Sequence, residues 1–358
     1  MPTPSSDRPT SSEADFAECR ALMKGGSKSF FAASLLLPNS VCKPATALYA
    51  FCRLADDAVD GEGGGLAALD GLRDRLDRIY AGNPAPIAAD REFAQVVAFY
   101  GIPKELPAAL IEGFEWDGLG RRYDDLSGVT AYGARVAGTV GAMMTMLMGV
   151  RDPEALARAC DLGIAMQFTN IARDVGEDAR NGRIYLPLSW MREEGIDPDA
   201  WLKDPKFDKA LGRVIKRLLK EADALYERSE AGIAALPPAC RGAIHAARFL
   251  YAEIGHKVRR QGYDSVTSRA VVPLYHKLWL MVTRLAISDF IPTRRLVAPP
   301  LAEAKFLVDA VAAAPDWPEA SRGKIRPPIR WWSFTDRVIW VLDLFEELER
   351  RDRLRQRA

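Results

Sequence analysis

Two pairs of aspartates are the residues whose type and spacing best suit chemistry. Asp56 and Asp60 are four positions apart, and so are Asp174 and Asp178. On an α-helix, residues four apart project from one face, so each pair would present two carboxylates side by side. Such like charges repel each other, and the positions around both pairs are mostly apolar. The pattern is therefore more typical of a binding site than of a solvated helix face.

The position of each pair along its helix indicates what it binds. Gly61 follows the first pair and Asn181–Gly182 follows the second, and both are signals that end a helix. The C-terminus of a helix is the negative end of its dipole, where cations are stabilised. Oxygen ligands suit Mg²⁺, with Mn²⁺ as the alternative, and Mg²⁺ is commonly held by carboxylates, waters and substrate phosphates. The sequence therefore predicts a divalent-cation site that holds a diphosphate substrate.

Basic residues stand beside the aspartates. Arg53 and Arg173 precede Asp56 and Asp174 by three positions and one position, and Lys28 lies in the SKSF stretch. These side chains can neutralise a leaving diphosphate and hold it after bond cleavage. The alternative is a salt bridge between each arginine and its neighbouring aspartate, and the sequence leaves both interpretations open.

Aromatic and methionine-rich stretches offer the wall of an apolar tunnel. For any one of these residues, ordinary core packing is the simpler interpretation. Many of them together would suit a long hydrocarbon, and ring faces there would stabilise carbocations. The candidates are Phe30, Phe31, Tyr49, Phe51, Phe168, Met143, Met144, Met146 and Met148.

The elements that position these residues are predicted to be helices. Apolar residues recur at spacings of three and four over 155–178 and 211–235, and no stretch alternates like a strand. Glycine and proline clusters break the helices without forming a convincing linker. We therefore expect an all-α fold with one large helical domain over 13–290. A disordered tail over 1–12 and a helical extension over 291–358, packed on the same domain, complete the predicted organisation.

Composition excludes several other classes of protein. The 358 residues include 49 basic and 48 acidic ones, which leaves a net charge of +1, whereas nucleic-acid binders usually carry a clear basic excess. Five cysteines without a CxxC pair and three histidines without zinc spacing favour a reduced, cytoplasmic protein. Neither a signal peptide nor a transmembrane helix is predicted, because the apolar stretch 278–290 is short and contains Arg284. Peripheral contact with a membrane stays open.

Four motifs carry a resemblance to a known family. They are SKSF at 27–30, LYAFCRLADDAVD at 48–60, VAGTVG at 136–141 and QFTNIARDVGEDARNGRIYLP at 167–187. With these motifs, the chain resembles the squalene/phytoene synthase family over residues 21–272, and most closely its bacterial phytoene-forming branch. The resemblance implies an isoprenoid (terpenoid) synthase fold in which both aspartate motifs face a central cavity.

The family's functional residues carry over motif by motif. Metal ligation is implied for Asp56, Asp60, Asn170, Asp174 and Asp178, and the four aspartates count as catalytic together with Tyr49 and Arg53. Contact with the diphosphate or with the reacting carbons is implied for Ser27, Lys28, Tyr132, Gln167, Asn170, Arg173, Tyr185 and Arg269.

The implied activity is that of a prenyltransferase. Two geranylgeranyl diphosphates would condense head to head through prephytoene diphosphate to phytoene, the first committed step of carotenoid biosynthesis, with Mg²⁺ and without NADPH. Downstream carotenoid enzymes and a membrane surface are the partners that this activity implies, and nucleic acid is not one. The alternative is a squalene, dehydrosqualene or presqualene diphosphate synthase that uses farnesyl diphosphate. A remoter alternative is a non-catalytic assembly factor on the same fold, which decayed aspartates would favour, although all four are present. The depth of the tunnel and the general base, a tyrosine or the released diphosphate, stay open.

Overall fold

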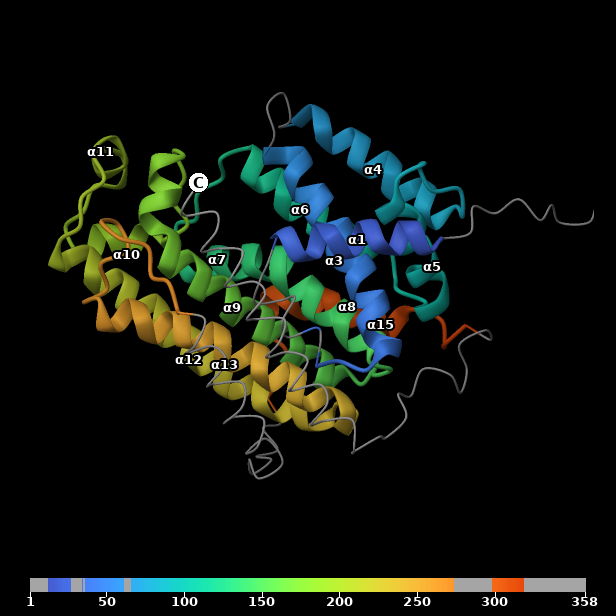
Figure 1. Cartoon of the computed structure of the whole chain (residues 1–358). Coiled ribbons are helices and arrows are strands. Elements are labelled where there is room, and N and C mark those ends of the chain that lie inside the picture. Colours follow the sequence, from blue (N-terminus) through green and yellow to red (C-terminus); the bar gives the residue numbers. More distant parts are fainter. Residues whose placement is uncertain (1–11, 27–33, 35, 61–65, 274–297, 319–358) are drawn as a thin grey trace, which may run out of the picture.

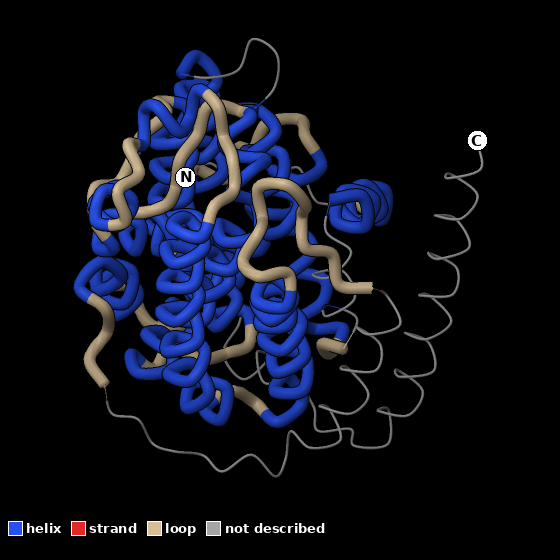
Figure 2. Tube along the Cα trace, turned by 90° about the vertical axis from the view of Figure 1, so that its left-hand side faces the viewer, coloured by secondary structure: helices blue, strands red, loops and turns tan. Residues whose placement is uncertain are grey.

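The computed structural model describes residues 12–26, 34, 36–60, 66–273 and 298–318 (Figure 1). Within these ranges every regular element is a helix, and loops connect them (Figure 2). The α-helices are α1 Glu13–Gly26, α3 Asn39–Asp60, α4 Leu66–Tyr80, α5 Ala88–Tyr100, α6 Glu105–Gly118, α7 Leu126–Gly133, α8 Thr139–Leu147, α9 Pro153–Arg180, α10 Leu188–Glu193, α11 Pro198–Lys203, α12 Lys209–Ala235, α13 Pro238–Arg260 and α15 Lys305–Ala313. A π-helical turn, η1, spans Ala134–Gly138, and a 3₁₀ turn, η3, spans Ala302–Ala304.

Local sequence explains where the two longest helices begin and end. The Asp152 carboxylate accepts a hydrogen bond from the backbone N–H of Ala155, and Pro153 takes the first position of α9, where no N–H is needed. Asp208 caps α12 in the same way. Shortly after α9 ends, Gly182 turns the chain with a φ of +74°. The helices predicted over 155–178 and 211–235 are confirmed, each two residues longer at its start, and α9 also two longer at its end.

Helix α9 is the central element of the described fold. It packs against α12, α13, α8 and η1, and Figure 1 shows α12 and α13 running alongside it. Helices α1, α3 and α5 form a second group of helices that pack against one another. One hydrophobic cluster draws buried side chains from α1 through α15, so the described helices share a continuous core.

The VAGTVG motif lies on an unusual helical segment beside α9. Helix α7, η1 and α8 follow each other without leaving the helical region of backbone conformation, and η1 inserts one π turn. The segment meets α9 backbone to backbone. A Cβ on Gly141 would lie 2.4 Å from the carbonyl oxygen of Ala159, and one on Gly163 would lie 2.4 Å from that of Ala137. Only glycine fits at this contact, and π turns often occur near functional sites.

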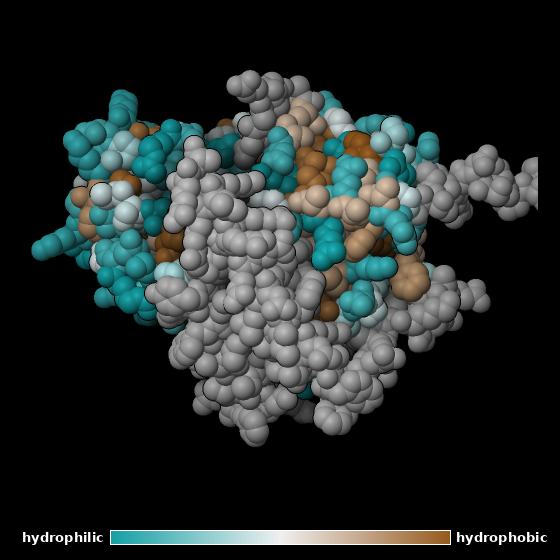
Figure 3. Space-filling model, viewed as in Figure 1, coloured by the Kyte–Doolittle hydropathy of each residue, from teal (hydrophilic) through white to brown (hydrophobic). Residues whose placement is uncertain are grey.

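The surface of the described residues carries both hydrophilic and hydrophobic side chains. Hydrophilic side chains cover α10 and α11, whereas hydrophobic ones are interspersed over the end that contains α1 and α3 (Figure 3). No helix in the described ranges has both the length and the apolar character needed to cross a bilayer.

Candidate active site

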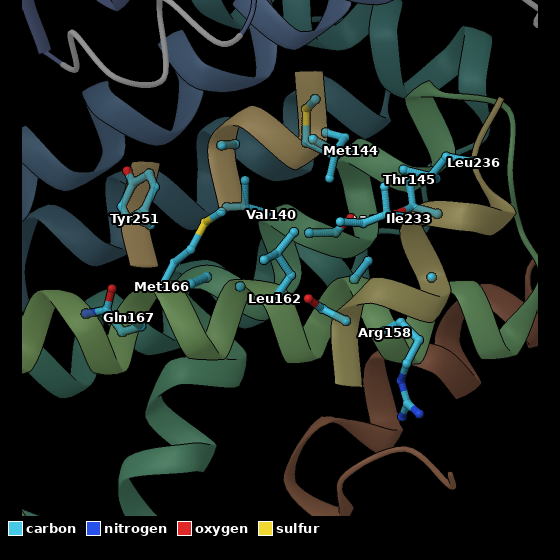
Figure 4. Close-up of a pocket in the computed structure, with 18 of the residues that line it drawn as sticks. Val140, Met144, Thr145, Arg158, Leu162, Met166, Gln167, Ile233, Leu236 and Tyr251 are labelled. Atoms are coloured by element: carbon cyan, nitrogen blue, oxygen red, sulfur yellow. Dashed lines mark hydrogen bonds between the residues drawn. The ribbon is translucent and has the colours of Figure 1, made fainter. Parts of the chain in front are cut away.

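A cavity of about 280 Å³ lies among η1, α8, α9, α12 and α13. Gln167 and Tyr251 lie at one end of it, and Arg158, Ile233 and Leu236 lie at the other (Figure 4). The wall between these ends is mostly aliphatic or sulfur-containing, with Val140, Met144, Leu162 and Met166. Such a wall suits a hydrocarbon chain, and the polar side chains at the Gln167 end suit its head group.

The second aspartate motif begins at the polar end of this cavity. Asn170, Asp174 and Asp178 follow each other at intervals of four along α9, so they share one face of the helix. Asn170 lines the cavity together with Gln167. Asp178 lies in the last turn of α9 and borders a separate small hollow with Tyr185. The structure thus extends a polar strip from the cavity to the C-terminal end of α9.

Two arginines hold the carboxylate of Asp174. The Nε atoms of Arg173 and Arg269 donate hydrogen bonds of 2.8 Å and 2.7 Å to its Oδ1, and Arg269 also lies 3.3 Å from Glu177. Burial raises the pKa of Asp174, but the hydrogen bonds and charges of the two arginines outweigh it, so the pKa lies below its ordinary value. The predicted salt bridge between Arg173 and Asp174 is therefore present.

Asp178 has a different electrostatic environment. Burial, followed by the negative charges of Asp174 and Glu177, raises the pKa of its carboxyl group to about 7. Among the described residues Asp178 takes part in no ion pair within 4.0 Å, although the charge of Arg183 acts on it from further away. A partly buried carboxylate in a negative environment is a place where a cation would be stabilised.

The side-chain oxygen of Asn170 supplies an independent test of the metal assignment. Its Oδ1 is buried and has no hydrogen-bond partner among the described residues. A buried carbonyl oxygen without a partner is costly unless a cation or a donor binds it. Asp178, which lies on the same face of α9, has no ion-pair partner among the described residues. This oxygen and the Asp178 carboxyl are therefore suitable ligands for a hard divalent cation.

The predicted metal site draws its residues from both aspartate motifs. Within the described ranges no three acidic, histidine or cysteine side chains converge as a ready metal centre. On α9 the carboxylate of Asp174 is engaged by Arg173 and Arg269. The side chain of Asp60 on α3 lies outside the described residues. The predicted five-ligand set therefore stays a prediction.

The first aspartate motif lies on α3 and is partly exposed. Arg53 contacts Asp56 at 3.3 Å and Asp57 at 2.6 Å, so its predicted salt bridge is also present. Tyr49 lies one turn earlier. Burial raises the pKa of Tyr49 to about 12, with the charge of Arg53 opposing it, and Tyr251 adds to the increase. Tyr49 is not among the residues that line the cavity.

Tyr132 and Tyr185 come together around a residue that the sequence analysis did not select. Their rings stack with centroids 5.1 Å apart, and both hydroxyl groups donate to Asp117 of α6. No motif or spacing singles out Asp117 in the sequence. Only the convergence of α6, α7 and the loop after α9 reveals it.

The remaining candidates divide between cavity, core and residues outside the description. Met144 and Met148 line the cavity, whereas Met143, Met146, Phe51 and Phe168 are buried in the core without lining it. Ser27, Lys28, Phe30 and Phe31 lie outside the described residues. Of the extension predicted over 291–358, the structure describes 298–318, which contain η3 and α15.

Comparison with known proteins places this site in a family. The profile of the squalene/phytoene synthase family matches residues 23–276. The chain belongs to the squalene/phytoene synthase family. It is 54% identical to a phytoene synthase of Cereibacter sphaeroides over 84% of this chain and 89% of the relative, and 53% identical to one of Rhodobacter capsulatus over 86% and 93%. A solved dehydrosqualene synthase matches the fold with a TM-score of 0.73 at 31% identity, over 78% of this chain and 98% of its own.

These findings confirm the family, the all-α isoprenoid synthase fold and the enzyme class expected from the four motifs. The protein is a prenyltransferase, and the phytoene-forming branch is better supported than the squalene-forming one. Members of the family use prenyl diphosphates and usually need a divalent metal ion.

Proposed function

We propose that this enzyme condenses two molecules of geranylgeranyl diphosphate, through prephytoene diphosphate, to phytoene. The observation that carries the proposal is the identity of 53–54% to phytoene synthases over most of both chains. The aspartate motifs, the arginines beside them and the apolar cavity supply matching chemistry.

The length of the cavity supports the longer prenyl chain. Asn170 and Ala155 both line it, and α9 rises about 22 Å between them at roughly 1.5 Å per residue. With C–C bonds of about 1.5 Å, the extended backbone of a geranylgeranyl group spans roughly 19 Å, and that of a farnesyl group roughly 14 Å. A C20 chain would therefore fill the cavity from its polar to its inner end.

The diphosphate would bind at the polar end of the cavity, where Gln167 lies. Asn170, Asp174 and Asp178 on α9, with Asp56 and Asp60 on α3, would hold Mg²⁺, which supplies charge neutralisation for a leaving diphosphate. Arg53, Arg173 and Arg269 lie beside these carboxylates and can transfer their hydrogen bonds to diphosphate oxygens. Gln167 lines the same end of the cavity and would orient the allylic carbon next to the diphosphate.

Ionisation of one substrate leaves an allylic cation, and the 2,3-double bond of the other attacks it. Loss of a proton closes the cyclopropane ring of prephytoene diphosphate. A second ionisation, rearrangement and loss of a proton then give phytoene. Two diphosphates and two protons leave in total, so no electrons are exchanged and no reductant is needed. The apolar wall excludes water, which would otherwise capture the cations.

Product analysis tests the proposal. The full-length protein is incubated with Mg²⁺ and either farnesyl or geranylgeranyl diphosphate, with and without NADPH. We expect a C40 hydrocarbon from geranylgeranyl diphosphate, at the same rate with and without NADPH. A C30 product as the preferred outcome, or a strict requirement for NADPH, would assign the protein to the squalene or dehydrosqualene branch.

A further inference from the structure

Asp117 links three segments that are far apart in the sequence. It lies in the last turn of α6, and its Oδ2 accepts a 2.8 Å hydrogen bond from the hydroxyl of Tyr132 on α7. Its Oδ1 accepts a 2.6 Å hydrogen bond from the hydroxyl of Tyr185, in the loop after α9. One carboxylate therefore binds both phenols, each through its own oxygen.

This arrangement fixes where the phenol protons point. An ionised carboxylate only accepts hydrogen bonds, so both hydroxyl protons face Asp117 and the lone pairs face elsewhere. Burial, followed by the charge of Asp117, raises the pKa of both tyrosines above its ordinary value. Tyr132 and Tyr185 are consequently neutral phenols with a defined orientation.

Neither phenol lines the cavity itself, and each lies beside one part of the candidate site. Tyr132 comes one turn before Val136, which lines the cavity, and Tyr185 borders the small hollow that also contains Asp178. Between the cavity wall at Val136 and Asp178, the proposed reaction would break the carbon–oxygen bond and develop positive charge.

Trp116, the residue before Asp117, is held in place by two arginines. The Trp116 ring has the guanidinium groups of Arg121 and Arg135 at 3.8 Å and 4.1 Å from its centroid. Arg135 belongs to η1 and also pairs with Glu112 of α6 at 2.9 Å. These contacts fasten the end of α6 to η1, so the carboxylate of Asp117 is preorganised.

We propose that Asp117 is a positioning residue that turns the Tyr132 and Tyr185 hydroxyl protons away from the substrate, so that neutral phenol oxygens and ring faces meet the developing carbocation. The proposal rests on the proposed carbocation reaction. A phenolate in this position would be a nucleophile able to form a covalent bond with the cation, whereas a hydrogen-bonded neutral phenol stabilises the charge without capturing it.

A double-mutant cycle tests whether Asp117 acts through Tyr132. Asp117→Asn, Tyr132→Phe and the double variant are assayed by diphosphate release with Mg²⁺. We expect Asp117→Asn to lower kcat about 10²-fold, a loss typical of one preorganised polar group. KM and the Mg²⁺ concentration for half-maximal rate should change less than about twofold, because the residue is not a ligand. The double variant should be no slower than the slower single variant.

Two further variants make the test independent of the folding of Asp117→Asn. Tyr132→Phe with Tyr185→Phe removes both hydroxyls and leaves Asp117 in place, and should lower kcat at least as much as Asp117→Asn. Glu115→Gln is the matched control, because Glu115 lies on the same helix and pairs with Arg73 at 2.7 Å, away from the tyrosines. It should keep the kcat of the unmodified enzyme.

Several outcomes would overturn the inference. One is an unchanged kcat in the variant with both Tyr132→Phe and Tyr185→Phe. Another is that the losses of kcat in Asp117→Asn and Tyr132→Phe multiply in the double variant. A third is that Asp117→Asn raises KM or the Mg²⁺ requirement and leaves kcat constant. Diphosphate release is measured with both C15 and C20 substrates. A preference for the C15 substrate would therefore refute the proposed product while leaving the cycle to decide the role of Asp117.

Discussion

Individual aspartates of the two motifs differ in how far nearby arginines neutralise them. Asp56 contacts Arg53, and Asp174 receives hydrogen bonds from both Arg173 and Arg269. Asp178 forms no ion pair among the described residues, and the pKa of its carboxyl group is raised to about 7. Of these three carboxylates, that of Asp178 is thus neutralised least, and a bound cation would stabilise its ionised form.

Substituting the outer aspartates should separate catalysis from stability. We expect Asp178→Asn, and likewise Asp60→Asn, to lower turnover by several orders of magnitude, because loss of a charged ligand forfeits roughly 3–5 kcal/mol of transition-state stabilisation. The melting temperature without ligand should stay equal or rise. Steady-state rates and thermal unfolding of the same samples check this. Reduced stability with near-normal turnover per folded molecule would instead make these aspartates structural.

The stability of Asp178→Asn should also depend on pH in a defined direction. The native carboxyl holds its proton up to about pH 7, whereas the unfolded one ionises near its ordinary value of 3.8. The native state binds more protons in this interval, so the unmodified protein loses stability as pH rises from about 4 to about 7. We expect Asp178→Asn to be more stable by about 1–2 kcal/mol near pH 8 and little changed near pH 4. Metal-free denaturant unfolding at both pH values measures it, and an equal difference at both would contradict the raised pKa.

At the scale of helices, the packing of α8, α9 and α12 sets the length of the cavity. Ala159 lines it in its inner part. We expect Ala159→Leu to lower kcat/KM for the C20 substrate at least about tenfold relative to the C15 substrate, because the added carbons occupy space that the distal isoprene needs. Ala157→Leu is the control, since Ala157 is buried on the same helix without lining the cavity. An unchanged C20-to-C15 ratio in Ala159→Leu would place the prenyl chain elsewhere.

An ion cluster between α9 and α12 lies beside the end of the cavity that Arg158 lines. Asp161 is fully buried and lies 2.8 Å and 3.1 Å from the Nε atoms of Arg158 and Arg228, both of which also donate to the carbonyl of Pro299. We expect Asp161→Asn to destabilise the protein by about 3–5 kcal/mol, because it leaves buried arginine charge without compensation. The exposed Asp199, which pairs with Arg122, supplies the control, and Asp199→Asn should cost less than about 1 kcal/mol. Comparable denaturation midpoints for the two variants would contradict this.

For the whole molecule, metal and diphosphate should act as one ligand. We expect activity to disappear with EDTA and to return with Mg²⁺, because Asp178 forms no ion pair among the described residues and a bound cation would stabilise its ionised form. Mg²⁺ together with inorganic diphosphate should raise the melting temperature more than either alone, since ligands that bind only the native state stabilise it. Full turnover in metal-free buffer would remove the basis of the site assignment.

The sequence by itself determined the features that depend on neighbouring residues. Apolar spacing defined α9 and α12, and the glycine and asparagine signals placed each aspartate pair at a helix end. Motifs as long as that of 167–187 also determined the family, because they combine many local requirements in one stretch. These features are local, and backbone geometry within one helix is enough to specify them.

Only the tertiary structure decided which distant residues meet. Asp174 is held by Arg269, 95 positions away, and Asp117 joins Tyr132 and Tyr185, which are 15 and 68 positions from it. The same holds for the cavity, whose inner end depends on contacts between α9, α12 and the segment at Pro299. No periodicity encodes such pairings, because they follow from how helices cross once their apolar faces are buried together.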